Sequence, residues 1–163
     1  MSSLRLALIA PVLLAASAPV AAQEIDPLRF FEGRTETRGT VKVMLKKPYR
    51  TRSIGLGRIE RDGSLLLVQQ VHDDGKPPHE RRWRVRQVRP GHFTGTMNEA
   101  TGPVTVDKVG NRYRFRFQMK GKLQVEQWLT PLPGGRAARN EVKVKRLGVT
   151  VATTEGTVRK LSK

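Results

Sequence analysis

The chain has 163 residues, of which 31 are Lys or Arg and 14 are Asp or Glu, so its formal net charge is +17 with the histidines neutral. This length is typical of one domain. The absence of cysteine excludes disulfides, thiolate metal sites, cysteine nucleophiles and a lipid-modified N-terminal cysteine.

The first 22 residues have the layout of a secretory signal peptide. Arg5 precedes an apolar run over 6–16, and small residues then lead to Ala22, which predicts cleavage between Ala22 and Gln23. The alternative is a membrane anchor, but the apolar run is short for a bilayer span of about 20 residues. We therefore expect a periplasmic or secreted protein.

Cleavage leaves a single predicted domain, 23–163, with a net charge of +16, because the leader removes Arg5 and no acidic residue. No later stretch approaches the length of a membrane span. A domain of this size buries enough surface to fold without disulfides.

From about Phe30 onward, apolar residues recur at every second position and turn residues interrupt them at short intervals. The clearest case is 112–119, where Tyr113, Phe115 and Phe117 alternate with arginines, which is typical of a strand with one buried face. Another strand centres on 82–86, and no stretch shows a sustained helical period. The other strands are predicted near 34–46, 50–61, 64–72, 91–98, 101–107, 122–130, 138–147 and 149–160.

This pattern predicts an all-β fold of about nine or ten antiparallel strands in a meander. A two-sheet sandwich and an up-and-down barrel both accommodate such a meander. We favour a lipocalin-like up-and-down barrel, because closure removes the exposed edge strands. In the mature chain, only a short N-terminal segment, 23–28, is expected to lie before the first strand.

Amides share the inward phase of several strands with apolar and aromatic side chains. Apolar walls with a few placed amides are typical of a small-molecule pocket. The alternative is that the amides lie at the barrel ends, in contact with water. The candidate ligand-binding residues are Gln69, Trp83, Gln87, Tyr113, Phe115, Phe117 and Gln127.

Six arginines lie on the opposite, outward phase of two of these strands: Arg82, Arg84, Arg86, Arg112, Arg114 and Arg116. They are candidates for contact with anionic envelope surfaces, such as lipopolysaccharide, phospholipid head groups or cell-wall polymers. The alternative is that they form an ordinary solvated strand face. Nucleic acid is not expected as a partner, because of the export signal and because the aromatic residues face away from the arginines.

The sequence offers little support for catalysis. His72, His79 and His92 lie in or beside turns without the spacing of a zinc site, so no metal is expected. No serine occupies a Gly-x-Ser-x-Gly elbow, and Gly55 and Gly57 precede a strand, so they form no dinucleotide-binding motif. No catalytic residue and no cofactor are predicted, and a hydrolase is the remaining enzyme alternative.

Several short motifs resemble those of a proteobacterial envelope family known as domain of unknown function number 3833. They are Phe31-Glu32-Gly33, Asp74-Gly75, Arg82-Trp83, Phe93-Thr94-Gly95-Thr96, Gly102, Gly110-Asn111, Glu126-Gln127-Trp128 and the closing segment 148–160. The resemblance implies a small exported lipocalin-like barrel without an established activity. Family members often look like lipoproteins, but this chain lacks the cysteine that such anchoring requires.

Two functions follow as hypotheses. The first is a binding or carrier protein whose barrel holds a small apolar or amphipathic ligand. The second is an envelope protein that contacts anionic surfaces through its arginine-rich exterior.

Overall fold

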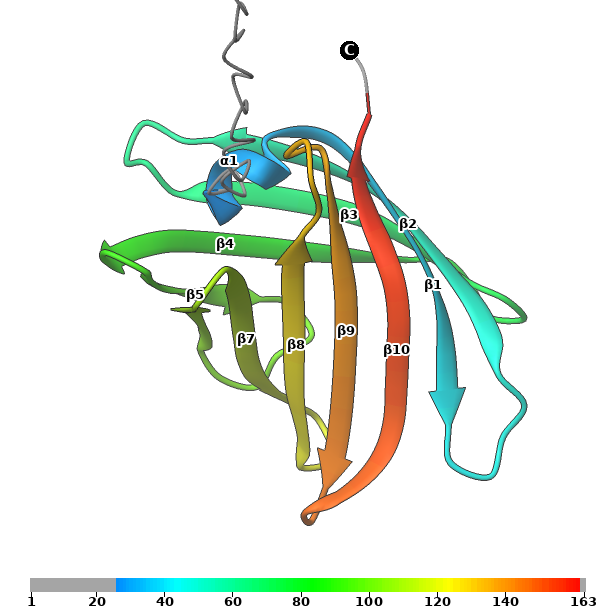
Figure 1. The fold of residues 1–163 in the computed structure, drawn as a ribbon. Helices are drawn as coiled ribbons and strands as arrows, with labels where there is room; N and C mark the ends of the chain where they lie inside the picture. Colours follow the sequence, from blue (N-terminus) through cyan, green and yellow to red (C-terminus); the bar gives the residue numbers. More distant parts are fainter. Residues whose placement is uncertain (1–25, 162–163) are drawn as a thin grey trace, which may run out of the picture.

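The alternating sequence forms ten antiparallel strands that pair with their neighbours in chain order, and β1 pairs with β10 to close a barrel (Figure 1). This computed structural model describes residues 26–161. The predicted leader and its cleavage site lie outside the described residues. The strands are β1 (Gly33–Val43), β2 (Tyr49–Ile59), β3 (Leu65–Asp73), β4 (His79–Arg89), β5 (His92–Met97), β6 (Val104–Val109), β7 (Arg112–Met119), β8 (Leu123–Pro131), β9 (Ala137–Arg146) and β10 (Val149–Lys160).

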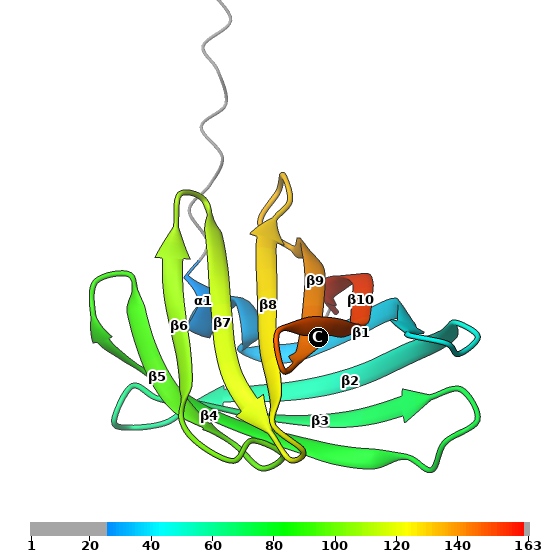
Figure 2. The same cartoon turned by 90° about the horizontal axis from the view of Figure 1, so that it is seen from below.

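The observed barrel confirms the predicted fold class and decides between barrel and sandwich. The strand bounds lie within a few residues of the predicted ones, and β7 coincides with its prediction over 112–119. Seen from below, β6–β9 cross β2–β4 at a steep angle, so two differently oriented walls enclose the interior (Figure 2). Among the described residues, no helix is long and apolar enough to cross a membrane.

A five-residue helix, α1 (Pro27–Phe31), was not predicted, because one turn and a half is too short to show a helical period. Local signals for it exist in the sequence. The Asp26 side chain accepts a hydrogen bond from the backbone N–H of Leu28 at 2.8 Å, and Pro27 occupies the first turn. The capped helix therefore begins within the segment 23–28 that was expected to lie outside the strands.

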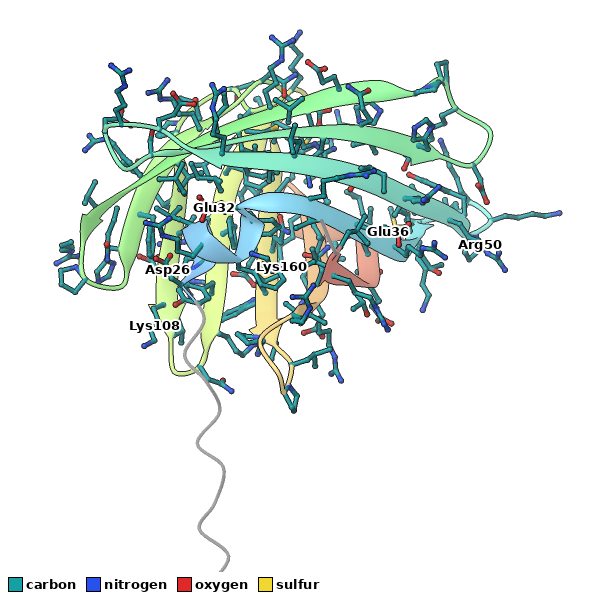
Figure 3. All side chains as sticks on the ribbon, turned by 90° about the horizontal axis from the view of Figure 1, so that it is seen from above. Asp26, Glu32, Glu36, Arg50, Lys108 and Lys160 are labelled. Atoms are coloured by element: carbon teal, nitrogen blue, oxygen red, sulfur yellow. The ribbon has the colours of Figure 1, made fainter. Side chains whose placement is uncertain are left out.

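The helix covers one end of the barrel, and its apolar side chains Leu28, Phe30 and Phe31 are buried there. Gly57 on β2 makes this close approach possible, because a Cβ at that position would lie 1.9 Å from the Phe31 carbonyl oxygen. Lys160 at the end of β10 donates a hydrogen bond to the Arg29 carbonyl oxygen at 2.8 Å. The two ends of the described chain therefore meet beside α1 (Figure 3).

In an antiparallel meander, alternate turns lie at the same end of the barrel. We call the end opposite α1 the mouth. It is formed by the turns 44–48, 74–78, 98–103, 120–122 and 147–148.

Candidate ligand-binding cavity

The two halves of the barrel interior differ in how fully side chains occupy them. Strands β4–β8 supply large side chains that pack in edge-to-face contacts. Trp83 lies 5.5 Å from Phe117 between ring centroids, and Phe93 lies 6.2 Å from Tyr113. This half is a solid core, to which Val104, Val106 and Leu129 also contribute.

Strands β1, β2 and β10 place mainly small residues on the inner face of the other half. The inward positions there include Gly39, Ser53, Ala152, Thr154 and Gly156, which cannot reach across the barrel. Gly39 and Gly156 are cross-strand partners, and a Cβ on either would lie 2.7 Å or less from a carbonyl oxygen of the facing strand. The result is an internal cavity of about 560 Å³.

The cavity extends along the barrel from α1 to the mouth. Phe31 lines it beside the helix, and Val43, Tyr49 and Val151 line it near the mouth. Apolar side chains of β3, β4, β7, β8 and β9 form most of the remaining wall, including Leu67, Trp83, Val85, Phe115, Phe117, Val125, Val142 and Val144.

Two amides meet polar partners in this apolar wall. Trp83 donates its indole N–H to Gln69 Oε1 at 2.8 Å, and Gln127 Nε2 donates to Asn140 Oδ1 at 2.7 Å. These pairs satisfy buried polar atoms that would otherwise destabilise the fold.

One group of polar side chains at the mouth lies on β2, β3 and the turn between β3 and β4. Lys76 donates to the Tyr49 hydroxyl at 2.6 Å and lies 3.6 Å from the Asp73 carboxylate. The hydrogen bond with Tyr49 is the main cause of a raised pKa for Lys76, so its ammonium stays charged at neutral pH. All three residues line the cavity and place charge where it meets solvent.

A second group at the mouth surrounds Glu99. Arg81 donates two hydrogen bonds to the Glu99 carboxylate, at 2.8 and 3.0 Å, and His79 Nε2 lies 3.1 Å from the same group. Arg81 lines the cavity on the inward phase that Trp83 also follows. Sequence reasoning could have found Arg81 by that phase, whereas Asn140 required the β8–β9 register.

Five of the seven candidate ligand residues line the cavity: Gln69, Trp83, Phe115, Phe117 and Gln127. Tyr113 points inward as expected but lies in the solid half against Phe93. Gln87 pairs with Phe93, whose side chain is buried, but Gln87 itself is exposed and lies outside the cavity, so it is not part of the candidate site. Gln87 lies near the β4–β5 turn at the α1 end of the barrel, which agrees with the alternative that an amide at a barrel end meets water.

The six candidate arginines lie on the outer faces of β4 and β7, which are separated by β5 and β6. Most of them are paired with acidic residues. Arg82 pairs with Glu80, Arg84 with Asp62, and Arg112 with Glu141. Contact of these arginines with an anionic surface stays a prediction.

The Asp107 carboxylate on β6 is the acidic partner of the two remaining β7 arginines and of a histidine. Arg116 lies 2.9 Å and Arg114 3.8 Å from its carboxylate, and His92 Nδ1 lies 2.8 Å from it. The hydrogen bond with His92, followed by that with Arg116, holds the pKa of Asp107 below its ordinary value. Among the six arginines, Arg86 alone has no ion-pair partner within residues 26–161.

A further hollow of about 620 Å³ lies on the outer surface of β6–β9 beside the mouth. It is lined partly by charged side chains of both signs, including Arg116, Glu126 and Lys143. Elsewhere, no group of three or more His, Asp or Glu side chains in residues 26–161 has the geometry to hold a metal ion.

The chain forms a closed ten-stranded barrel, and several solved structures are similar to it in fold. The S-type phycobiliprotein lyase CpeS from Guillardia theta aligns with a TM-score of 0.65 at 7% identity, covering 83% of this chain and 92% of that one. Rv2717c from M. tuberculosis aligns with a TM-score of 0.59 at 14% identity, covering 85% and 99%.

A protein of unknown function from the DUF3598 family of Nostoc punctiforme aligns with a TM-score of 0.62 at 12% identity, covering 90% of this chain and 53% of that one. These identities show a shared fold alone. The sequence matches the family "Protein of unknown function (DUF3833)" over residues 16–160, so the chain belongs to that family. No curated protein matches it.

Proposed function

We propose that this protein binds a small amphipathic molecule, with the apolar part of the ligand inside the barrel and its polar part at the mouth. The observation that carries the proposal is the cavity of about 560 Å³, whose wall is mainly apolar and whose charged side chains lie where it meets solvent. This volume lies within the range of about 300–1,000 Å³ that is usual for ligand pockets.

Three features of the cavity support binding over catalysis. Its interior is lined mainly by apolar side chains and small residues, and the amides within it are already paired with Trp83 and Asn140. The charged groups are confined to the mouth, where Lys76 and Arg81 are held by Asp73 and Glu99. A structurally similar barrel belongs to a phycobiliprotein lyase, so the fold accommodates chemistry as well, and the proposal rests on the lining of this chain alone.

The place of action that we propose, the periplasm or the exterior, rests on the leader sequence. A carrier that holds an apolar molecule in water is useful in such a compartment because membranes and their lipids border it.

A neutral fluorescent probe, N-phenyl-1-naphthylamine, tests the cavity directly. We expect the probe to bind the purified protein and to lose roughly tenfold or more in affinity in Ala152→Phe, which places an aromatic ring in the cavity. Thr153→Phe is the matched control, because its neighbouring position on β10 faces outward. Unchanged binding by a folded Ala152→Phe protein would overturn the proposal.

Native mass spectrometry of protein isolated from its own cells identifies the natural ligand. We expect an additional mass that is released by organic solvent and that is lost in Ala152→Phe. A mass retained equally by Ala152→Phe would place the bound molecule outside the cavity.

A further inference from the structure

Two leucines stand exposed at the tips of two turns of the mouth. Leu45, in the turn between β1 and β2, is 98% exposed, and Leu147, between β9 and β10, is 81% exposed. Their neighbours Met44 and Val149 are also more than half exposed. The β1–β2 and β9–β10 turns lie at the same end of the barrel (Figure 1), and Met44 donates its backbone N–H to the Val151 carbonyl oxygen at 2.9 Å.

The backbone at these two positions makes leucine an unexpected choice. Leu45 has a φ of 63° and Leu147 a φ of 50°, in the left-handed region where glycine and asparagine are favoured and leucine is strained. Neither leucine contributes to the core, because both side chains face solvent. Folding therefore explains neither residue, and strain held at an exposed tip points to a role in contact.

Exposed cations surround these tips and differ from the arginines of the β4 and β7 walls. Within the part of the chain that the structure describes, none of them has an acidic partner. Figure 3 places Arg50 at the end of the barrel away from α1. The group, which we call the mouth cations, is Lys42, Lys46, Lys47, Arg50, Lys120, Lys122, Lys145 and Arg146.

The acidic residues near the mouth do not neutralise this group. Asp73 lies 3.6 Å from Lys76, and Glu99 is held by Arg81 and His79. Asp74 is the remaining acid of these turns. The mouth therefore presents a net positive rim with apolar tips.

We propose that the mouth docks on the surface of an anionic phospholipid bilayer, with Leu45 and Leu147 entering the interface and the mouth cations contacting lipid phosphates. Apolar side chains next to cations are the usual composition of surfaces that bind such interfaces. The two leucines stand at the tips of separate turns, and such protruding apolar tips suit insertion into a fluid interface.

Docking in this orientation turns the opening of the cavity toward the lipid. An apolar ligand could then pass between bilayer and barrel with little exposure to water. The docking itself does not depend on the proposed function, since the surface residues of the tips lie outside the cavity lining.

Cosedimentation of the full chain with phosphatidylcholine vesicles, with and without phosphatidylglycerol, tests the proposal. We expect binding only to the vesicles that contain phosphatidylglycerol, with a steep loss as salt rises. Binding that is absent at low salt, or that is insensitive to salt, would overturn the proposal.

Substitutions at the tips give the sharper test. Leu45→Asn together with Leu147→Asn should weaken vesicle binding by about tenfold or more while leaving thermal stability unchanged or raised, because asparagine tolerates the left-handed backbone. Leu56→Asn is the matched control, since Leu56 is 62% exposed on the outer wall of β2. Wild-type vesicle binding by the double variant, or a loss of its stability, would overturn the proposal.

The mouth cations are tested in the same assay. Lys46→Gln with Lys47→Gln should weaken binding by about tenfold, whereas Arg61→Gln with Arg89→Gln, exposed cations near the closed end, should leave it unchanged. Binding of N-phenyl-1-naphthylamine in all these variants should equal that of the wild type, so failure of docking and failure of cavity binding are distinguished. Equal effects of the two charge variants would show that net charge, and not the mouth, governs binding, and would overturn the proposal.

Discussion

At the scale of single residues, Asp62 shows how an exposed carboxylate can be held in its ionised form. Its side chain accepts hydrogen bonds from the Ser64 hydroxyl at 2.6 Å and from the Ser64 backbone N–H at 3.0 Å, and it pairs with Arg84. These contacts, led by the Ser64 hydroxyl, lower the pKa of Asp62 from 3.8 to about 2.

This pKa predicts a pH dependence of stability. Because the pKa of Asp62 is lower in the folded than in the unfolded chain, its contribution to stability is complete above about pH 4 and is lost as pH falls toward 2. NMR titration of the carboxyl should give a pKa near 2, and Ser64→Ala should return it toward 3.8. A pKa that does not move in Ser64→Ala would contradict the assignment of the cause.

Another residue-scale prediction concerns the pair inside the cavity. Gln69→Met preserves the shape of the side chain but removes the acceptor for the indole N–H of Trp83. We expect a loss of about 1–3 kcal/mol in the free energy of unfolding, measured with urea, because a buried donor is left unsatisfied. Gln70→Met on the solvent face of β3 should change it by less than about 0.5 kcal/mol.

At the scale of elements, the seating of α1 on Gly57 is testable. Gly57→Ala places a methyl group against the Phe31 carbonyl oxygen, so either the helix or β2 must shift. We expect a loss of about 1–3 kcal/mol in unfolding free energy and faster hydrogen exchange in α1. Gly102→Ala is the control, since its methyl group would meet open space, and an equal effect of the two substitutions would disprove the seating.

The elements also show what the sequence could and could not predict. Period-two alternation located every strand, because each needs one buried and one wet face. It missed α1, which carries a cap and a proline but no period, and it could not show that Gln87, near the β4–β5 turn, is exposed at the end of the barrel.

At the scale of the whole molecule, the uneven filling of the barrel predicts an uneven response to the same truncation. Val106 is 1% exposed in the solid half, whereas Val41 lines the cavity. We expect Val106→Ala to reduce the free energy of unfolding by about 2–3 kcal/mol, and Val41→Ala by less than about 1 kcal/mol. Similar losses at both sites would indicate that the second half of the barrel is filled.

The sequence by itself determined the strands, their inward and outward faces and an antiparallel meander, whereas the pairing of β1 with β10 that closes the barrel came from the tertiary structure. The alternation of apolar and polar residues is a local property, because it can be recognised in each strand separately. It could not reveal which inward residues lie across the barrel from one another. The cavity depends on the tertiary structure, because it arises where the small residues Gly39, Ser53 and Ala152 face a wall of packed aromatic side chains.

The same distinction holds for the charge. Composition gave a net charge of +17 and the alternating phase put the arginines outside, but neither could assign partners to them. The folded chain pairs five of the six candidate arginines on β4 and β7 with acids. The meander gathers alternate turns at one end, together with exposed leucines and with cations that have no acidic partner within residues 26–161. Ion pairing and shared ends join residues distant in sequence, so only the tertiary structure decided them.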